Sequence, residues 1–241
     1  MDFLALAIIC IVGAMLQALI GFGFPIFAMI FLVRLFPFSA AVTISQFAGL
    51  IGVGFFFFKY FKEVRWNILF PFLFPALIIG IFLTWYSAKL PISGLKICLG
   101  FVLILIALYM FFYSGRFSVR PTRLLGCSMG AVSGVLNGVF AMGGPPVALY
   151  LLPVTENKIA YLASANAYFF IFKIFSLPIR FLNGAVSIEQ SSYLVVSLMG
   201  MTVGTVIGDK IMHRINEAML KKMVYLFIGI SGIVIVLEEL F

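Results

Sequence analysis

Charged residues are scarce in this sequence. Asp, Glu, Lys and Arg make up 10% of its 241 residues, whereas an average soluble domain carries roughly 25%. Hydrophobic residues make up 64%, so a soluble fold would have to leave many Phe and Leu side chains in water. No polar stretch is long enough to form a separate soluble domain. The composition therefore predicts one integral membrane domain.

Residues typical of enzymes and metal sites are also few. The sequence has one histidine, His213, and three cysteines. Each cysteine stands alone in an apolar stretch, at Cys10, Cys98 and Cys127. It has no H-E-x-x-H motif, no phosphate loop and no credible nucleophile–base pair. We therefore predict neither an enzyme nor a site for a metal or cofactor. The N-terminus has no basic region typical of a signal peptide, so the first apolar block is expected to stay in the protein.

The net charge of +8 does not indicate nucleic-acid binding. The basic residues are dispersed among short loops between apolar blocks. In membrane proteins such residues orient the chain, because Lys and Arg accumulate in cytoplasmic loops. We expect a multi-pass protein of the cell (inner) membrane, with basic loops in the cytoplasm and lipid as its surroundings.

Six apolar blocks have the length of a membrane-spanning helix. They cover about 38–58, 66–86, 94–113, 158–179, 189–209 and 219–237. Two further blocks, 3–33 and 124–153, are too long for one straight helix. Each contains a cluster of helix-breaking residues, Gly21-Phe22-Gly23-Phe24-Pro25 in the first and Gly143-Gly144-Pro145-Pro146 in the second. Both blocks are predicted to be broken, either as tilted helices or as re-entrant hairpins.

The two halves of the sequence match at an offset of 121 residues. This offset places Gly23 on Gly144 and Pro25 on Pro146, and it places Ser45 on Asn166. The match indicates an internal duplication, with one repeat over 1–115 and the other over 116–241. The predicted fold is all-α, with two repeats that each consist of a hairpin followed by three transmembrane helices.

The positions of the basic residues favour a hairpin at 124–153. If this block crossed the membrane, the flanking bases would divide 7 to 8 between the two faces. If it enters and leaves on one face, 11 bases lie inside, and only Arg34, Lys89, Lys96 and Arg180 lie outside. If the first block is also a hairpin, each repeat crosses three times. The repeats are then inverted, and both termini lie outside.

The two hairpin tips form a candidate anion site. A helix that restarts at the tip has unpaired N–H groups and a partial positive charge at its N-terminus. Inverted hairpins would direct two such ends at one point near the midplane. The candidate residues are Gly23, Phe24, Pro25, Gly143, Gly144 and Pro145. The alternative is that the breaks only help the helices to pack.

Polar residues inside the following spans extend this candidate site. Their hydroxyl and amide groups can donate hydrogen bonds to an oxyanion, or can hold neighbouring helices together. They are Thr43, Ser45, Gln46, Asn137, Ser164 and Asn166. Lys173 is the base deepest in an apolar span, where a charge indicates function by default. The alternative is that its side chain reaches the interface.

The sequence around the tips resembles the sulfite exporter TauE/SafE-like family of bacterial anion transporters. The resemblance lies in Gly13 to Pro25, in Gly130 to Pro146 and in the Gly204-Thr-Val-Ile-Gly208-Asp-Lys stretch. It implies a carrier of small sulfur-containing anions such as sulfite, thiosulfate or organosulfonates. Phe22 and Phe24 stand where tips of that family are richer in glycine, which suits a more apolar part of the ligand.

Energetics favour export. With a cytoplasm negative by about 100 mV, moving one negative charge outward gains about 2.3 kcal/mol. The alternatives to a carrier are an anion channel and a membrane protein with a structural or signalling role. The sequence leaves open the particular anion, whether it is imported or exported, the coupling ion and whether the protein forms a homodimer.

Overall fold

The structure is a computed structural model, and it describes residues 3–87, 104, 122–185 and 191–240. All regular elements within these residues are helices, which confirms the predicted all-α class. A short 3-10 helix, η1, covers Phe61–Glu63. The α-helices are α1 (Phe3–Ile20), α2 (Phe24–Leu32), α3 (Phe38–Lys59), α4 (Trp66–Tyr86), α6 (Arg123–Phe140), α7 (Gly144–Leu151), α8 (Lys158–Leu182), α9 (Ser191–Met212) and α10 (Glu217–Leu240).

Six of these helices are long and apolar enough to cross a membrane, namely α1, α3, α4, α6, α8 and α9. Together they support a multi-pass membrane protein. Four of the six blocks expected to span coincide with α3, α4, α8 and α9, and the block 219–237 forms α10. The predicted span 94–113 lies outside the described residues, apart from residue 104.

Both long apolar blocks are broken at the predicted places. The first divides into α1 and α2 around Gly21–Gly23, and the second into α6 and α7 around residues 141–143. In each case the second arm folds back along the first. Gly13 on α1 lies against the rings of Phe24 and Phe27 on α2, and Gly126, near the start of α6, lies against Tyr150, near the end of α7. The two arms therefore form hairpins rather than tilted helices.

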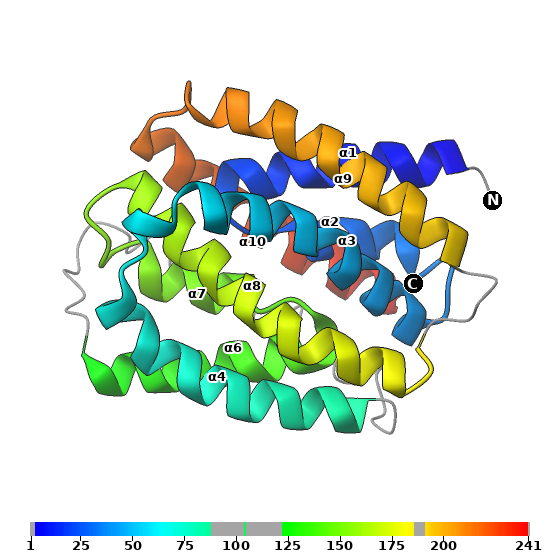
Figure 1. Cartoon of the computed structure of the whole chain (residues 1–241), viewed down its shortest axis with the longest axis horizontal. Helices are drawn as coiled ribbons and strands as arrows, with labels where there is room; N and C mark the ends of the chain where they lie inside the picture. Colours follow the sequence, from blue (N-terminus) through cyan, green and yellow to red (C-terminus); the bar gives the residue numbers. More distant parts are fainter. Residues whose placement is uncertain (1–2, 88–103, 105–121, 186–190, 241) are drawn as a thin grey trace.

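The hairpins enter the helical bundle from opposite ends (Figure 1). Helix α1 runs inward from the end where α3 begins, and α2 returns toward that end. Helix α6 runs inward from the end where α3 finishes, and α7 returns toward it. The long arms therefore point in opposite directions through the molecule.

Each long arm packs closely on a helix from the other half of the sequence. A Cβ at Gly134 on α6 would lie 2.6 Å from the carbonyl oxygen of Ala76 on α4, and one at Gly204 on α9 would lie 2.3 Å from that of Ile11 on α1. Glycine allows these backbones to approach within a distance that a side chain would prevent. The pairs α4–α6 and α1–α9 thus share one mode of packing, and both depend on rows of glycines: Gly130, Gly134 and Gly138, and Gly200, Gly204 and Gly208.

Ion pairs join the two halves at the end where α3 finishes. Lys59 Nζ lies 2.6 Å from Asp209 Oδ2 on α9, and Arg65 Nε lies 2.7 Å from Glu156 Oε2 in the loop before α8. The hydrogen bond from Arg65 lowers the pKa of Glu156 and raises that of Arg65. Lys59 is therefore engaged in a contact between the halves.

Candidate functional site

The two hairpin tips meet inside the molecule. The chain between α1 and α2 turns through two left-handed residues, Gly21 at φ +82 and Gly23 at φ +110. Between α6 and α7 it turns through Ala141 at φ 60, the only described non-glycine residue with positive φ. The ring of Phe22 from the first tip lies directly against Gly144 of the second. The predicted convergence of the tips is therefore present in the structure.

Side chains of α8 pair with carbonyl groups that the helix breaks leave free. The Tyr161 hydroxyl donates to the carbonyl of Ile20, the last residue of α1, over 2.9 Å. Arg180 Nη2 donates to the carbonyl of Gly138, near the end of α6, over 2.6 Å. An unpaired carbonyl would be costly at this depth, because lipid offers no water to bind it. Helix α8 therefore supplies a hydrogen-bond donor at each of the two helix breaks.

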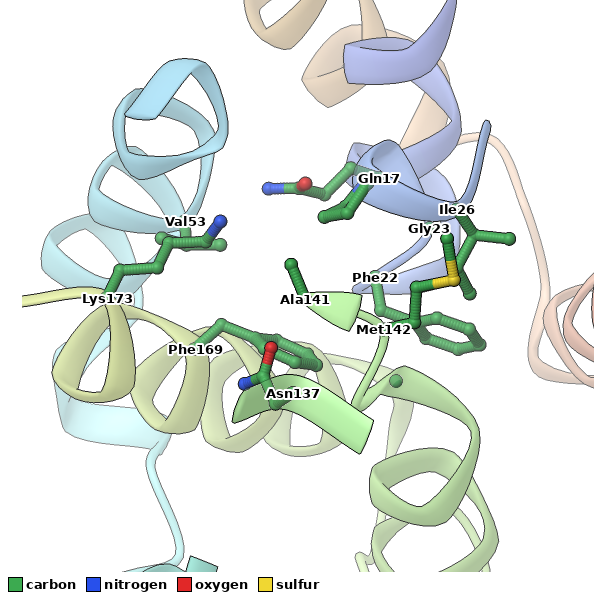
Figure 2. A pocket seen from close by; sticks show the side chains of 12 residues that line it. Gln17, Phe22, Gly23, Ile26, Val53, Asn137, Ala141, Met142, Phe169 and Lys173 are labelled. Atoms are coloured by element: carbon green, nitrogen blue, oxygen red, sulfur yellow. The ribbon is translucent and has the colours of Figure 1, made fainter. Parts of the chain in front are cut away.

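A small pocket with room for about one water molecule lies between the tips, within about 320 Å³ of space that includes open solvent. Its lining combines residues of both tips with residues of the long helices beside them (Figure 2). The lining residues are Gln17, Phe22, Gly23, Pro25, Ile26, Val53, Asn137, Ala141, Met142, Gly144, Phe169 and Lys173. The pocket thus has three polar side chains, and the remaining walls are apolar or backbone.

Hydrogen-bond donors dominate the polar part of the pocket. Lys173 and Gln17 point their nitrogen atoms toward one another in Figure 2. Lys173 is 4% exposed, and its Nζ donates a hydrogen bond to the carbonyl of Gln46 over 3.1 Å. Gln17 is 2% exposed, and its Nε2 has no partner. Because an ammonium carries three N–H groups and an amide nitrogen two, this part of the pocket offers donors to an anion.

Asn137 is the third polar side chain of the pocket. Its Nδ2 donates to the hydroxyl of Tyr168 over 3.4 Å, and the same hydroxyl lies 2.9 Å from Ser133 Oγ. Ser133 also donates to the carbonyl of Gly143 over 2.8 Å. This chain of hydrogen bonds fixes the second tip against α8. Asn137 thus lines the pocket while it also supports the tip.

Gln46 lies beside the pocket and accepts hydrogen bonds from two buried basic side chains. Its backbone carbonyl accepts from Lys173, and its side-chain Oε1 accepts from Ser176 Oγ and Arg180 Nε, both at 3.2 Å. Gln46 Nε2 is buried and has no partner. Arg180, like Lys173, is 4% exposed. The lysine therefore faces the interior rather than extending to the interface.

Among the described residues, no carboxylate pairs with Lys173 or Arg180. The ion pairs in this part of the chain join Lys59 to Asp209 and Arg65 to Glu156. Buried charges in proteins are normally paired, because an isolated ion in a low-dielectric medium is costly. The uncompensated positive charge at this depth makes the pocket suitable for an anion.

The helix restarts add to this positive field less evenly than the sequence analysis assumed. Both α2 and α7 begin with proline in their first turn. Because proline has no N–H, Pro145 and Pro146 remove two of the donors that the N-terminus of α7 would otherwise offer. More of the hydrogen-bond donors in the pocket therefore come from the side chains of Lys173 and Gln17 than from the helix ends.

The structure brings some of the candidate residues together and leaves others apart. Gly23, Pro25, Asn137, Gly144 and Lys173 line the pocket. Phe24, Gly143, Pro145 and Gln46 lie next to it in the chain or through hydrogen bonds. Thr43 and Ser45 donate to carbonyls of their own helix, those of Ser39 and Val42.

The two polar residues of α8 that match Thr43 and Ser45 also lie outside the lining. Ser164 Oγ accepts from the backbone N–H of Arg65 over 3.0 Å. Asn166 Nδ2 donates to the carbonyl of Leu162 over 2.7 Å, and its Oδ1 is buried without a partner. All four residues bond backbone groups in this structure, as the packing alternative allows: Thr43, Ser45 and Asn166 within their own helix, and Ser164 to Arg65 before α4.

Sequence reasoning missed Gln17 and Arg180. Gln17 is a single amide in an apolar block, a signal that the rule for intramembrane polar residues would have detected. Arg180 was counted with the interfacial bases because it lies near the end of a span. Two glycines of α3 were also missed. A Cβ at Gly49 would lie 2.9 Å from Lys173 Nζ, and one at Gly52 would lie 3.0 Å from Gln17 Nε2.

The family model described as sulfite exporter TauE/SafE matches residues 5–235. The chain belongs to this family. Its members are membrane transporters and not enzymes, so this chain is a transporter in the membrane. No curated relative and no solved structure matches the chain significantly. The resemblance seen in the glycine-rich tips thus extends over almost the whole sequence.

Proposed function

We propose that this TauE/SafE protein carries a small sulfur-containing anion, such as sulfite, thiosulfate or an organosulfonate, and binds it in the pocket between the hairpin tips. The observation that carries the proposal is the buried ammonium of Lys173, which shares the pocket with the unpaired amide donor of Gln17. Among the described residues no carboxylate neutralises this ammonium. The donors fit an oxyanion, whose oxygen atoms accept hydrogen bonds.

The apolar part of the lining bears on which anion is carried. Phe22, Ile26, Met142 and Phe169 give the pocket an apolar wall opposite its donors. An inorganic anion would lose water against this wall without any compensating contact, whereas the carbon portion of a sulfonate would be buried favourably. Sulfite and thiosulfate are small enough to contact the donors alone. A panel of substrates must therefore include both kinds.

We propose further that the two halves, residues 1–115 and 116–241, are inverted repeats. Shifting α1, α2 and α3 by 121 residues gives 124–141, 145–153 and 159–180. These ranges agree closely with α6 (Arg123–Phe140), α7 (Gly144–Leu151) and α8 (Lys158–Leu182). The hairpins enter from opposite ends in Figure 1, and the reciprocal pairing of α1 with α9 and α6 with α4 is what a two-fold relation would produce.

Inverted repeats supply a route for alternating access. One half can tilt against the other around a fixed site, which exposes the site first to one face and then to the other. The contacts that would part on one side are those joining Lys59 to Asp209 and Arg65 to Glu156, since each connects the two halves. With the basic loops in the cytoplasm, this end would face inward. Outward movement of the anion is then favoured by the membrane potential.

The test is transport by purified protein in liposomes with a panel of sulfite, thiosulfate, taurine, isethionate and sulfoacetate. Saturable transport of at least one anion is expected. Lys173→Gln and Gln17→Ala should each lower the affinity by about tenfold or more, because they remove donors from a desolvated site. Lys62→Gln is the matched control, because Lys62 is exposed on η1 and lies outside the pocket.

Three results would count against the proposal. Unchanged transport in both pocket variants would place the site elsewhere. Unitary currents in place of saturable exchange would indicate a channel. A protein that folds in liposomes and moves none of these anions would favour a structural or signalling role.

A further inference from the structure

Two cations share one face of α8. Lys173 and Arg180 are seven residues apart, so they lie two turns from one another and about 10 Å apart along the helix axis. Both are buried, and both bind the same residue of α3, because the carbonyl of Gln46 accepts from Lys173 and its Oε1 accepts from Arg180. An anion bound beside Lys173 would therefore lie near two cationic side chains rather than one.

Among the described residues, neutral groups accept the hydrogen bonds of these two cations. Arg180 donates to Gln46 and to the carbonyl of Gly138, and Lys173 donates to the carbonyl of Gln46. Gly138 lies in the last turn of α6, where the helix dipole places about half a negative charge. This dipole offsets part of the arginine charge. Among the described residues no carboxylate balances the remaining positive charge near the pocket.

We propose that the pocket selects doubly charged oxyanions over singly charged ones of the same shape, and that Arg180 is the residue responsible for this preference. The inference rests on the proposed function, since it concerns the charge of the anion that Lys173 binds. Lys173 alone would balance a monoanion. The second charge of a dianion is balanced by Arg180, which does not line the pocket and acts on the ligand through the field between them.

The size of the expected preference follows from the distance between Arg180 and an anion bound beside Lys173, for which we take the spacing of the two cations along α8. At about 10 Å and an effective dielectric constant near 20, one additional unit of charge changes binding by about tenfold. Salt in the surrounding water screens this interaction little, because both cations are buried. The preference should therefore persist at high ionic strength, unlike attraction by loop residues at the surface.

The experiment measures equilibrium binding by calorimetry on purified protein, with two pairs of probes that differ in charge and hardly in shape. The first pair is sulfite in its doubly charged form against methanesulfinate. The second is sulfate against methanesulfonate. For a pair that binds, the dianion is expected to bind about tenfold more tightly than its methyl analogue. Equal affinities, or tighter binding of the methyl analogue, would overturn the proposal.

Two substitutions of Arg180 separate its charge from its hydrogen bonds. Arg180→Gln removes the charge and should reduce the preference to about threefold or less, because a dianion loses twice as much attraction as a monoanion when the charge is removed. Arg180→Lys keeps the charge but loses the forked geometry, and it should retain the preference. If Arg180→Gln does not fold, Arg180→Lys still decides, because loss of the preference in that variant would contradict an effect of charge.

The outcomes also separate this inference from the proposed function. Binding of both members of a pair with equal affinity would leave the pocket as an anion site and refute the charge preference alone. Absence of binding by all four probes and by the transport panel would refute both. Binding that survives Lys173→Gln with its dianion preference intact would place the site, and the preference, away from α8.

Discussion

The ring of Phe22 fills the space beside the α-carbon of Gly144, so that a Cβ at position 144 would lie 2.1 Å from Phe22 Cδ2. These residues belong to different hairpins and are separated by 122 positions in the sequence. Their contact brings the two helix breaks together. It also explains why one tip carries an aromatic residue where the other carries glycine, since the first tip inserts into the second.

Substitution of Gly144 should disturb this contact. Gly144→Ala is expected to weaken anion binding by about tenfold or more, because the added methyl group forces the tips apart in a close-packed interior. The double variant Phe22→Ala/Gly144→Ala removes the obstructing ring and should recover part of the affinity. Binding by calorimetry on folded protein measures both effects. If Gly144→Ala binds like the wild type, the tips do not shape the site.

Much of the fold could be predicted from the sequence because membrane-spanning segments have a strong signal. Apolar length identified α3, α4, α8 and α9, and the Gly-Pro clusters located both helix breaks to within a few residues. Two local properties were sufficient: the length of each hydrophobic stretch predicted the spans, and the missing N–H of proline predicted the breaks. Neither depends on how distant parts of the chain pack.

The site was harder to predict because its chemistry depends on distant contacts. Thr43 and Ser45 have the right character and depth, but their hydroxyls bond their own helix. Arg180 looked like an interfacial anchor, yet its guanidinium reaches the carbonyl of Gly138 and is buried. Which of these groups bond locally and which reach another helix follows from packing, and a single sequence does not encode packing in a readable pattern.

Loss of the Tyr161 hydroxyl should destabilise the first hairpin. Tyr161→Phe keeps the ring but leaves the buried carbonyl of Ile20 without its donor, at a cost of about 1–3 kcal/mol. The matched control is Tyr150→Phe, which removes a longer hydrogen bond of 3.2 Å to Ile68, away from the tips. Thermal unfolding in detergent should show the larger loss for Tyr161→Phe. Equal losses would mean that the hydrogen bond at the end of α1 contributes no more to stability than the one between Tyr150 and Ile68.

Glycine-mediated contact between α4 and α6 gives a prediction of stability. In Gly134→Ala the new Cβ would lie 2.6 Å from the carbonyl oxygen of Ala76, a backbone atom that cannot rotate away. We expect a loss of about 1–3 kcal/mol, typical of overpacking. In Gly54→Ala the nearest atom is Cε2 of the Phe170 ring at 3.2 Å, which can shift slightly.

The comparison of these two alanine variants tests the packing mode itself. Gly54→Ala should cost less than about 1 kcal/mol, since its neighbour is a side-chain ring that needs to shift only slightly. Both substitutions improve helix propensity equally, so that term cancels between them. Thermal unfolding that ranks Gly54→Ala as the more damaging variant would contradict the close approach of α4 and α6.

The ion pair of Arg65 and Glu156 gives a prediction for pH. The hydrogen bond from Arg65 lowers the pKa of Glu156 below its usual value of 4.5 in the folded protein. A depressed carboxyl pKa contributes stability that is present above the usual pKa and is lost as the pH falls through the lower, folded value. Because both side chains are largely in solvent, the contribution is small and screened by salt.

Unfolding temperatures of the wild type and Glu156→Gln, measured against pH, check this assignment. The wild type should be slightly more stable by a constant margin from about pH 6 to pH 8, because Glu156 stays fully ionised there. That margin should shrink as the pH falls below the usual carboxyl range, and it should shrink at high salt. A margin that grows on acidification would mean that protonated Glu156 is favoured in the fold, since the sign of the linkage would then be reversed.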